Sequence, residues 1–214
     1  SGIVIANPNA PTGLLLSLSN IRKLADEHPN AVIVIDEAYI DFAMLDAANG
    51  ETTVSAVSLI NEFDNILITQ TFSKSRSLAG LRVGMAFGNV SLIEALTRMK
   101  NSFNSYPLDK LAQAGARASV LDNEYFEQTC QQVIALRESL TTGLTALGYQ
   151  VLPSHANFIF ARPPKGDASE VASSLREQGI IVRHFDKPRI QEYLRITVGT
   201  QEQNERLITA LRDL

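Results

Sequence analysis

Four short apolar runs, rich in valine and isoleucine, divide the first half of the chain. They are residues 3–6, 31–35, 66–69 and 83–87. Asn, Asp, Pro or Gly bounds each of them. Continuous apolar runs of this length are typical of strands that are buried on both faces of a sheet.

A helical pattern separates the first two runs. Four apolar residues share one face of it: Leu18, Ile21, Leu24 and Ala25. Ser17 or Ser19 suits the N-cap. Strand, helix and strand at this spacing predict βαβ units, and hence a mainly parallel sheet covered by helices.

The second half of the chain changes character. A helical stretch is predicted from Asp109 to about Leu147, with Gly148 ending it. Strands are then expected at 151–152, 157–161, 180–182 and 193–198, and helices at 168–178 and 201–214. Thr200 and Gln203 form a capping box for the last helix.

The predicted fold class is therefore α/β, with a large mainly parallel sheet followed by a small α+β domain. The expected domains are residues 1–106, a connecting helical region at 107–147, and residues 148–214. The chain opens at Ser1, almost directly in an apolar run. We expect from this that the first part of the large domain is absent.

Composition narrows the class of protein. The 214 residues carry a net charge of −4 and are 45% hydrophobic, which is ordinary for a globular chain and gives no footprint for nucleic acid. No apolar run approaches the roughly 20 residues that span a bilayer, so no membrane partner is expected. Cys130 is the single cysteine and the three histidines are scattered, so we expect a cytoplasmic protein with no metal site.

Polar loops follow three of the predicted strands. These loops are residues 7–13, 36–39 and 71–74, the last continuing to a glycine-rich segment at 78–84. In open α/β sheets, ligands bind beyond the carboxyl ends of the strands. We therefore expect the three loops to build one site.

The charged residues in these loops suit pyridoxal phosphate. Lys74 supplies an amine that forms an imine, Arg82 a planar fork for the phosphate, and Asp36 a carboxylate for the ring nitrogen. Charges about 4 Å apart attract by about 4 kcal/mol at an effective dielectric constant near 20, enough to keep the ring protonated. Each residue also has an ordinary interpretation. Lys74 would be a solvated lysine, Arg82 half of a surface ion pair, and Asp36 a helix N-cap or a buried, hydrogen-bonded acid.

Uncharged neighbours complete the expected cofactor site. Tyr39, three residues after Asp36, is placed to hydrogen-bond the ring hydroxyl, and Ser73 and Thr71 to donate to the phosphate.

As an ordered set, these motifs resemble the fold-type-I, class-II aminotransferases, and the resemblance runs over essentially the whole chain. The motifs are Asn7–Gly13, Asp36–Tyr39, Ser73–Lys74 and Leu78–Gly84. Within that family, residues 36–42 and 194–200 resemble the branch that acts on histidinol phosphate in histidine biosynthesis.

The resemblance implies roles for single residues. Lys74 would carry the cofactor and shuttle the proton at the substrate Cα. Arg195 would bind a carboxylate of the amino-acid or 2-oxo-acid partner, and Arg183 the phosphate of the substrate. The implied reaction moves an amino group between histidinol phosphate and 2-oxoglutarate, in a full-length protein that is a homodimer.

The chain departs from the family pattern in two ways. Ala10 stands where the family carries an asparagine that bonds the ring hydroxyl, so Asn9 or Asn7 would replace it, or Tyr39 would act alone. The family's long segment ahead of Asn7 supplies the loop that cups the phosphate. Without it we expect the 214 residues to bind the cofactor weakly and turn over little.

Alternatives remain open at this point. A threonine-phosphate decarboxylase and an aromatic aminotransferase have similar architecture. A regulator that uses this fold only to bind a ligand is the alternative of another class.

Overall fold

A computed structural model describes residues 2–47 and 54–214 of the chain. The chain divides into two compact units. The first comprises Ser1–Asn9 and Leu15–Cys130, and the second Ala10–Leu14 and Gln131–Leu214. The expected division at residues 106 and 147 stays a prediction.

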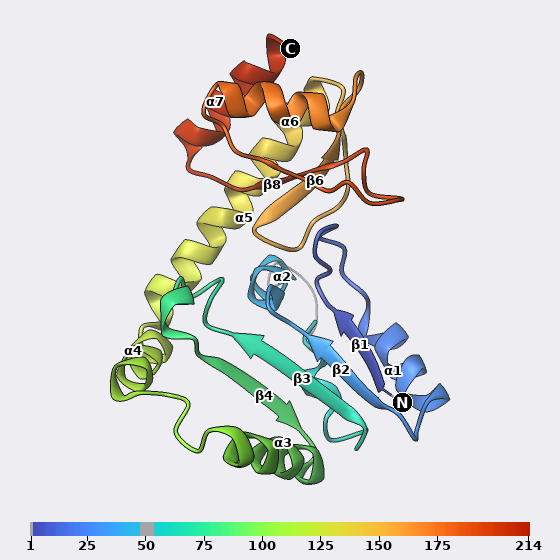
Figure 1. Cartoon of the computed structure of the whole chain (residues 1–214), viewed down its shortest axis with the longest axis vertical. Coiled ribbons are helices and arrows are strands. Elements are labelled where there is room, and N and C mark those ends of the chain that lie inside the picture. The colour runs from blue at the N-terminus through green and yellow to red at the C-terminus, as the bar shows by residue number, and fades with distance from the viewer. Residues whose placement is uncertain (1, 48–53) are drawn as a thin grey trace. The chain divides into compact units, whose positions relative to one another are not determined.

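The first unit contains a four-stranded sheet in the order β1-β2-β3-β4 (Figure 1). Its strands are β1 (Gly2–Ala6), β2 (Val32–Asp36), β3 (Ile66–Thr71) and β4 (Gly84–Gly88). The first three pair in parallel, and β4 pairs with β3 in the antiparallel sense. The predicted mainly parallel sheet is confirmed, with one antiparallel strand.

The two faces of this sheet differ. Ile33 and Ile35 of β2 pack with Ile21 of α1 (Leu18–Glu27) into a fully buried core. Val4 is 74% exposed, because side chains alternate along a strand and its own lies on the opposite face. The interpretation of strands buried on both faces is therefore wrong for β1, whereas it holds for the start of β3, where Ile66, Leu67 and Ile68 are all buried. Asp36 pairs in register with Ala6 and shares the open face with Val4.

Several helices flank the sheet of the first unit. They are α1, α2 (Ile40–Ala47), the 3-10 turns η1 (Ala56–Leu59) and η2 (Ala79–Leu81), α3 (Val90–Phe103), α4 (Lys110–Leu121) and the start of α5 (Asn123–Ala146). Ser17 is the N-cap of α1, one of the two predicted positions. No helix in the described ranges is long and apolar enough to cross a membrane.

The long helical stretch expected from Asp109 to Leu147 is in fact two helices. Asp122 ends α4, and its backbone amide donates to the carbonyl of Ala118. Asp and Asn compete with helical hydrogen bonding through their own side chains, which makes Asp122-Asn123 a suitable break. Gly148 follows α5 with a positive φ of 84°, as the sequence predicts for a helix end.

The second unit contains an antiparallel sheet in the order β5-β6-β8-β7. Its elements are β5 (Gln150–Val151), β6 (Phe158–Arg162), α6 (Ala168–Glu177), β7 (Arg183–His184), β8 (Leu194–Thr197) and α7 (Gln201–Arg212). The strand expected at 180–182 is wrong, because only Arg183 and His184 reach the register that pairs with β8. The predicted capping box of Thr200 and Gln203 is present.

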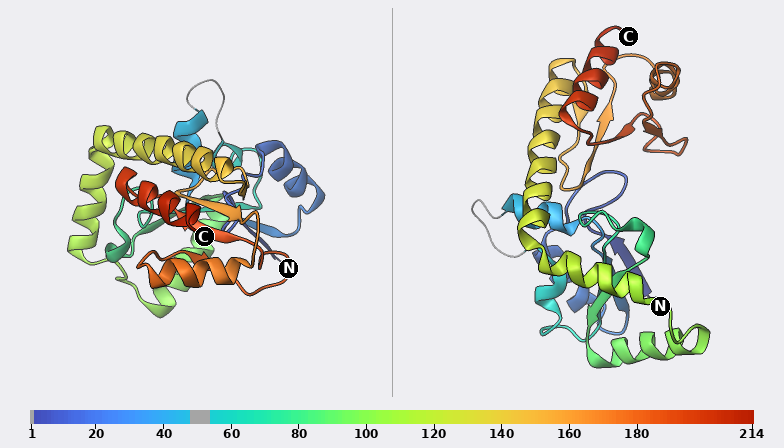
Figure 2. Two further views of the ribbon diagram at one scale, coloured as in Figure 1. Left: turned by 90° about the horizontal axis from the view of Figure 1, so that it is seen from above. Right: turned by 90° about the vertical axis from the view of Figure 1, so that its left-hand side faces the viewer.

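The helices of this unit pack on one face of its sheet. Ile159 of β6 and Ile196 of β8 join Leu144 of α5 and Leu207 of α7 in its core, and α7 lies beside α5 in both views of Figure 2. Alternation turns Arg195 to the opposite face of the sheet.

Candidate active site

Lys74 and Tyr39 come together at the carboxyl edge of the first sheet. Because β2 and β3 are parallel, the loops that follow Asp36 and Thr71 start from the same edge. The ammonium nitrogen of Lys74 lies 5.3 Å from the centre of the Tyr39 ring. Lys74 is exposed, so its amine is open to a ligand from solvent.

Asp36 stands at this edge with a carboxylate that is partly used. Its Oδ1 accepts a hydrogen bond of 3.2 Å from the backbone amide of Ala38. Its Oδ2 has no protein partner among the described residues. This contact holds the turn after β2 and is not a helix cap, since α2 begins only at Ile40. The other carboxylate oxygen is available to a ligand.

Thr71 shapes the loop that carries Lys74. Its hydroxyl oxygen accepts from the backbone amide of Ser73 at 3.1 Å and lies 3.4 Å from the carbonyl of Val83, to which it donates. The backbone of Lys74 accepts from the amide of Ser77 at 3.0 Å, which closes the next turn. That Thr71 and Ser73 donate to a phosphate stays a prediction. The hydroxyl of Thr71 already stabilises the loop through these two hydrogen bonds.

Arg82 sits in a strained backbone conformation near the same loop. It is left-handed, with φ 55° and ψ 38°, which a non-glycine residue rarely adopts. One guanidinium nitrogen donates to the carbonyl of Ala79 at 2.7 Å. Among the described residues no carboxylate pairs with Arg82, so the surface ion pair of its ordinary interpretation does not form. Its other donors remain available to an anion.

Asn7 has a structural role that the sequence does not reveal. It is fully buried, and its amide group accepts from the backbone nitrogen of Leu16 at 2.7 Å and donates to the carbonyl of Leu16 at 3.1 Å. Both polar atoms are committed to closing this loop. Asn7 therefore does not suit the part of the missing family asparagine, which leaves half-buried Asn9 or Tyr39.

Arg183 and Arg195 are brought together in the second unit. They are direct cross-strand partners between β7 and β8. The ring of Phe185 lies 5.3 Å from the guanidinium carbon of Arg183 and 5.8 Å from that of Arg195. Like charges directly opposite on a sheet are destabilising, and the Nε of Arg195 is buried without a hydrogen-bond partner. Both observations favour an anionic ligand here.

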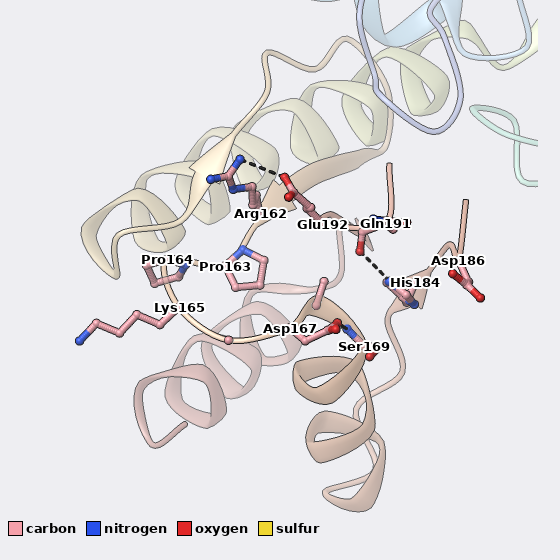
Figure 3. Close-up of a pocket in the computed structure, with 12 residues that line it drawn as sticks. Arg162, Pro163, Pro164, Lys165, Asp167, Ser169, His184, Asp186, Gln191 and Glu192 are labelled. Atoms are coloured by element: carbon pink, nitrogen blue, oxygen red, sulfur yellow. Dashed lines mark hydrogen bonds and ion pairs between the residues drawn. The ribbon is translucent and has the colours of Figure 1, made fainter. Parts of the chain in front are cut away.

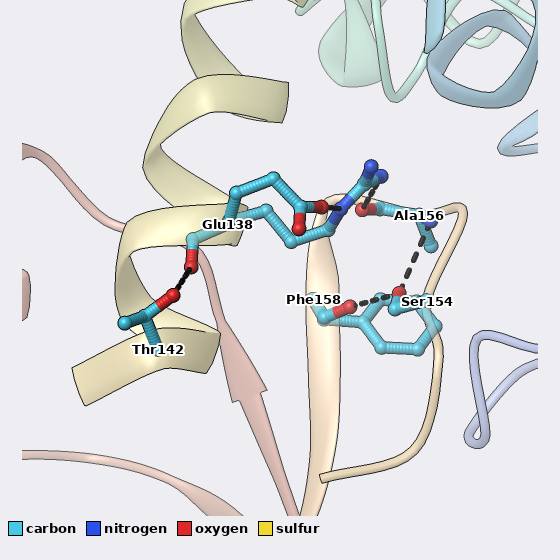
Figure 4. A network of polar contacts seen from close by, with 6 residues as sticks. Glu138, Thr142, Ser154, Ala156 and Phe158 are labelled. Atoms are coloured by element: carbon cyan, nitrogen blue, oxygen red, sulfur yellow. Dashed lines mark hydrogen bonds and ion pairs between the residues drawn. The ribbon is translucent and has the colours of Figure 1, made fainter. Parts of the chain in front are cut away.

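Phe158, the first residue of β6, is a second aromatic neighbour of Arg195. The ring of Phe158 lies 5.3 Å from the Arg195 guanidinium carbon. Ser154 holds this residue in place, since its hydroxyl donates to the carbonyl of Phe158 at 2.5 Å and accepts from the amide of Ala156 at 3.2 Å (Figure 4). The buried Arg137 also donates to the carbonyl of Ala156, at 3.3 Å.

His184 lies on the helix-facing side of β7, away from the arginine pair. Its Nε2 is 2.8 Å from the carbonyl oxygen of Gln191, and it lines a cavity of about 860 Å³ (Figure 3). The ion pair of Arg162 and Glu192 also borders that cavity, with 3.1 Å between N and O. The contact with the Gln191 carbonyl accounts for His184, and the ion pair accounts for Arg162 and Glu192. None of the three side chains requires a ligand in this cavity.

Glu37 and Phe185 were missed by the sequence analysis. Glu37 is 1% exposed, and its carboxylate accepts from Ser55, the amide of Ala56 and Gln70 at 2.7, 2.6 and 2.9 Å. Burial raises its pKa, and these hydrogen bonds partly oppose the rise. Glu37 anchors the end of β2 next to Asp36. The only signal for it was an acid directly after an apolar run.

Comparisons with known proteins show the family of this chain. The model of the family described as aminotransferase class I and II matches residues 1–211. Histidinol-phosphate aminotransferase 2 of Psychrobacter arcticus is 81% identical over 214 residues, which are 100% of this chain and 57% of the relative. The chain thus spans somewhat more than half the length of that relative.

Two solved structures share the fold. The histidinol-phosphate aminotransferase of Clostridium acetobutylicum matches with a TM-score of 0.86 and 25% identity, over 99% of this chain and 63% of that one. The L-threonine-O-3-phosphate decarboxylase of Porphyromonas gingivalis matches with a TM-score of 0.79 and 26% identity, over 98% and 63%. The family match over nearly every residue, on a fold-type-I scaffold, means that this chain belongs to the aminotransferase class I and II family.

Proposed function

We propose that this protein is a pyridoxal-phosphate-dependent aminotransferase that moves an amino group between histidinol phosphate and 2-oxoglutarate. The observation that carries the proposal is the pairing of Arg183 and Arg195 across two strands, with a buried Nε that lacks a partner. Two adjacent cations suit a phosphate ester or a second carboxylate, which an aromatic amino acid does not offer. The name of the 81% identical relative supports the same substrate.

The loops of the first unit fit the cofactor in the chemistry of their donors. We assign its ring nitrogen to the second carboxylate oxygen of Asp36 and its ring hydroxyl to Tyr39 or Asn9. Its phosphate is assigned to Ser73, Thr71 and Arg82. When bound, the cofactor supplies an electron sink for the charge that develops at the substrate Cα. Lys74 holds the cofactor covalently and moves the proton at that Cα as general base and acid.

The cytoplasmic location and the homodimer expected from the sequence stay predictions. Neither is tested by the fold of a single chain.

A threonine-phosphate decarboxylase is the second candidate, because a structure of that name shares the fold. Its substrate also carries a phosphate, so the arginine pair suits both reactions. The product separates them, since one reaction transfers nitrogen to a 2-oxo acid and the other releases carbon dioxide.

The test supplies the full-length protein with pyridoxal phosphate, 2-oxoglutarate and one of three amino donors, which are histidinol phosphate, threonine phosphate and phenylalanine, and measures glutamate and carbon dioxide. We expect glutamate with histidinol phosphate, and a loss of about 10-fold or more in kcat/KM for Arg195→Lys, because a bidentate fork is replaced by a point charge. Arg162→Lys is the matched control. Carbon dioxide from threonine phosphate, or activity with phenylalanine alone, would contradict the proposal.

A further inference from the structure

Phe185 occupies a position that links the two arginines. Its ring centre lies within 6 Å of both guanidinium carbons, at 5.3 Å from Arg183 and 5.8 Å from Arg195. Phe185 directly follows β7 and is half-buried, whereas Arg183 is exposed. One ring therefore contacts two cations that come from different strands.

The contact with the Phe185 ring offsets the electrostatic repulsion between the two arginines. Register pairs Arg183 with Arg195, so two positive charges face each other on one side of the sheet. The long arginine side chains would otherwise move apart, since neither guanidinium group has a hydrogen bond to another described part of the protein that would hold it. The negative face of an aromatic ring attracts guanidinium groups within about 6 Å. Because the Phe185 ring attracts both guanidinium groups, it keeps them close to each other.

The second aromatic contact involves only one of the arginines. Phe158, the first residue of β6, has its ring 5.3 Å from the guanidinium carbon of Arg195, and its backbone carbonyl accepts a hydrogen bond from Ser154. Among the residues that the structure describes, two aromatic rings thus contact Arg195, whereas Phe185 is the one ring that contacts Arg183. Loss of Phe185 would release Arg183 entirely and leave Arg195 in place.

We propose that Phe185 is a positioning residue, which holds the guanidinium groups of Arg183 and Arg195 together as one site for a doubly charged phosphate group. The inference rests on the proposed function, because that function supplies the phosphorylated substrate. Phe185 itself takes no part in the chemistry. It sets the spacing of the two cations, and through this spacing the preference for a dianion over a singly charged carboxylate.

The experiment titrates the 214-residue chain with inorganic phosphate and, separately, with acetate. Binding is followed by NMR through the Nε–H signals of the arginines, assigned with Arg183→Lys and Arg195→Lys. The variants are Phe185→Leu, which keeps apolar volume without a ring, and Phe185→Tyr, which keeps the ring. Tyr193→Leu is the matched control, since Tyr193 lies in the same unit and stacks on Phe160 at 4.8 Å rather than on an arginine.

We expect phosphate to shift the Arg195 Nε–H signal in the unaltered chain, since that nitrogen lacks a partner. Phe185→Leu should weaken phosphate binding about 10-fold while changing acetate binding less than 2-fold, in line with the strength of cation–π contacts. Phe185→Tyr and Tyr193→Leu should bind phosphate as the unaltered chain does.

The outcomes separate this inference from the proposed function. If Phe185→Leu binds phosphate as tightly as the unaltered chain, the positioning role is wrong and the arginine site survives. If phosphate and acetate affinities fall equally in Phe185→Leu and Tyr193→Leu, the ring acts only in packing and the inference fails. If the unaltered chain gives no arginine shift with phosphate, the phosphate subsite of the proposed function fails as well.

Discussion

Gly13 offers a sharp test of how the Pro-Thr-Gly turn is held. It is buried with a positive φ of 80°, and a Cβ added there would lie 2.8 Å from the Cβ of Ser154 and 3.1 Å from its Cα. Ser154 cannot turn away without loss, because its hydroxyl bonds Phe158 and Ala156. Gly13→Ala should therefore force either the turn or the loop to move.

Gly166→Ala is the matched control for this change. Gly166 lies in the same unit with φ 77°, and nothing lies within 4 Å of an added Cβ. Both variants bear the cost of a left-handed alanine, about 1–2 kcal/mol. Gly13→Ala alone adds overpacking, about 1–3 kcal/mol.

The assay is thermal unfolding of both variants and the unaltered chain, followed by circular dichroism. A difference of about 2 kcal/mol corresponds to roughly 4–8 °C in Tm for a chain of this size. We expect Gly13→Ala to melt below Gly166→Ala by that amount. Equal melting temperatures would refute the reasoning, because they would show that the contact with Ser154 is absent or yields freely.

Three further predictions concern buried polar groups. Asn7→Asp should lose about 1–3 kcal/mol at neutral pH, where a carboxylate faces the carbonyl of Leu16, and recover in acid, where the protonated group donates to that carbonyl; urea unfolding at pH 4 and 7 checks this, and a loss independent of pH contradicts it. Burial raises the pKa of Cys130 to about 12, so a thiol reagent at pH 8 should label it only in denaturant, and rapid labelling of the folded chain would overturn this. Because the pKa of Glu37 is raised by burial, its contribution to stability is present below the ordinary pKa of about 4.3 and is lost as pH rises through the raised value. Glu37→Gln should remove this pH dependence of the free energy of unfolding. An unchanged pH dependence would exclude Glu37 as its source.

Much of the fold follows from local sequence patterns. The strand that ends at Asp36, the cap at Ser17 and the box of Thr200 with Gln203 all depend on neighbours within a few residues. Parallel pairing then brings the predicted loops to one edge of the sheet. The confirmed features are those whose physical cause lies within one element or its connections.

The remaining features depend on partners distant in sequence. Asn7 was a candidate for bonding the cofactor's ring hydroxyl, but its side-chain amide is hydrogen-bonded to the backbone of Leu16, nine positions away. The strand predicted at 180–182 failed because pairing with β8 begins at Arg183. Phe185 gains its significance only from that same register. Tertiary pairing, which periodicity does not encode, decides each of these cases.

The central claim is that the amine of Lys74 holds the cofactor. The most direct measurement incubates the chain with pyridoxal phosphate, reduces the covalent link with borohydride and maps the modified peptide by mass spectrometry. Lys100 and Lys110 serve as internal controls, since both are exposed lysines on or at the ends of helices. The account predicts modification at Lys74 that Asp36→Ala strongly reduces. Equal modification of all three lysines, unchanged in Asp36→Ala, would contradict it.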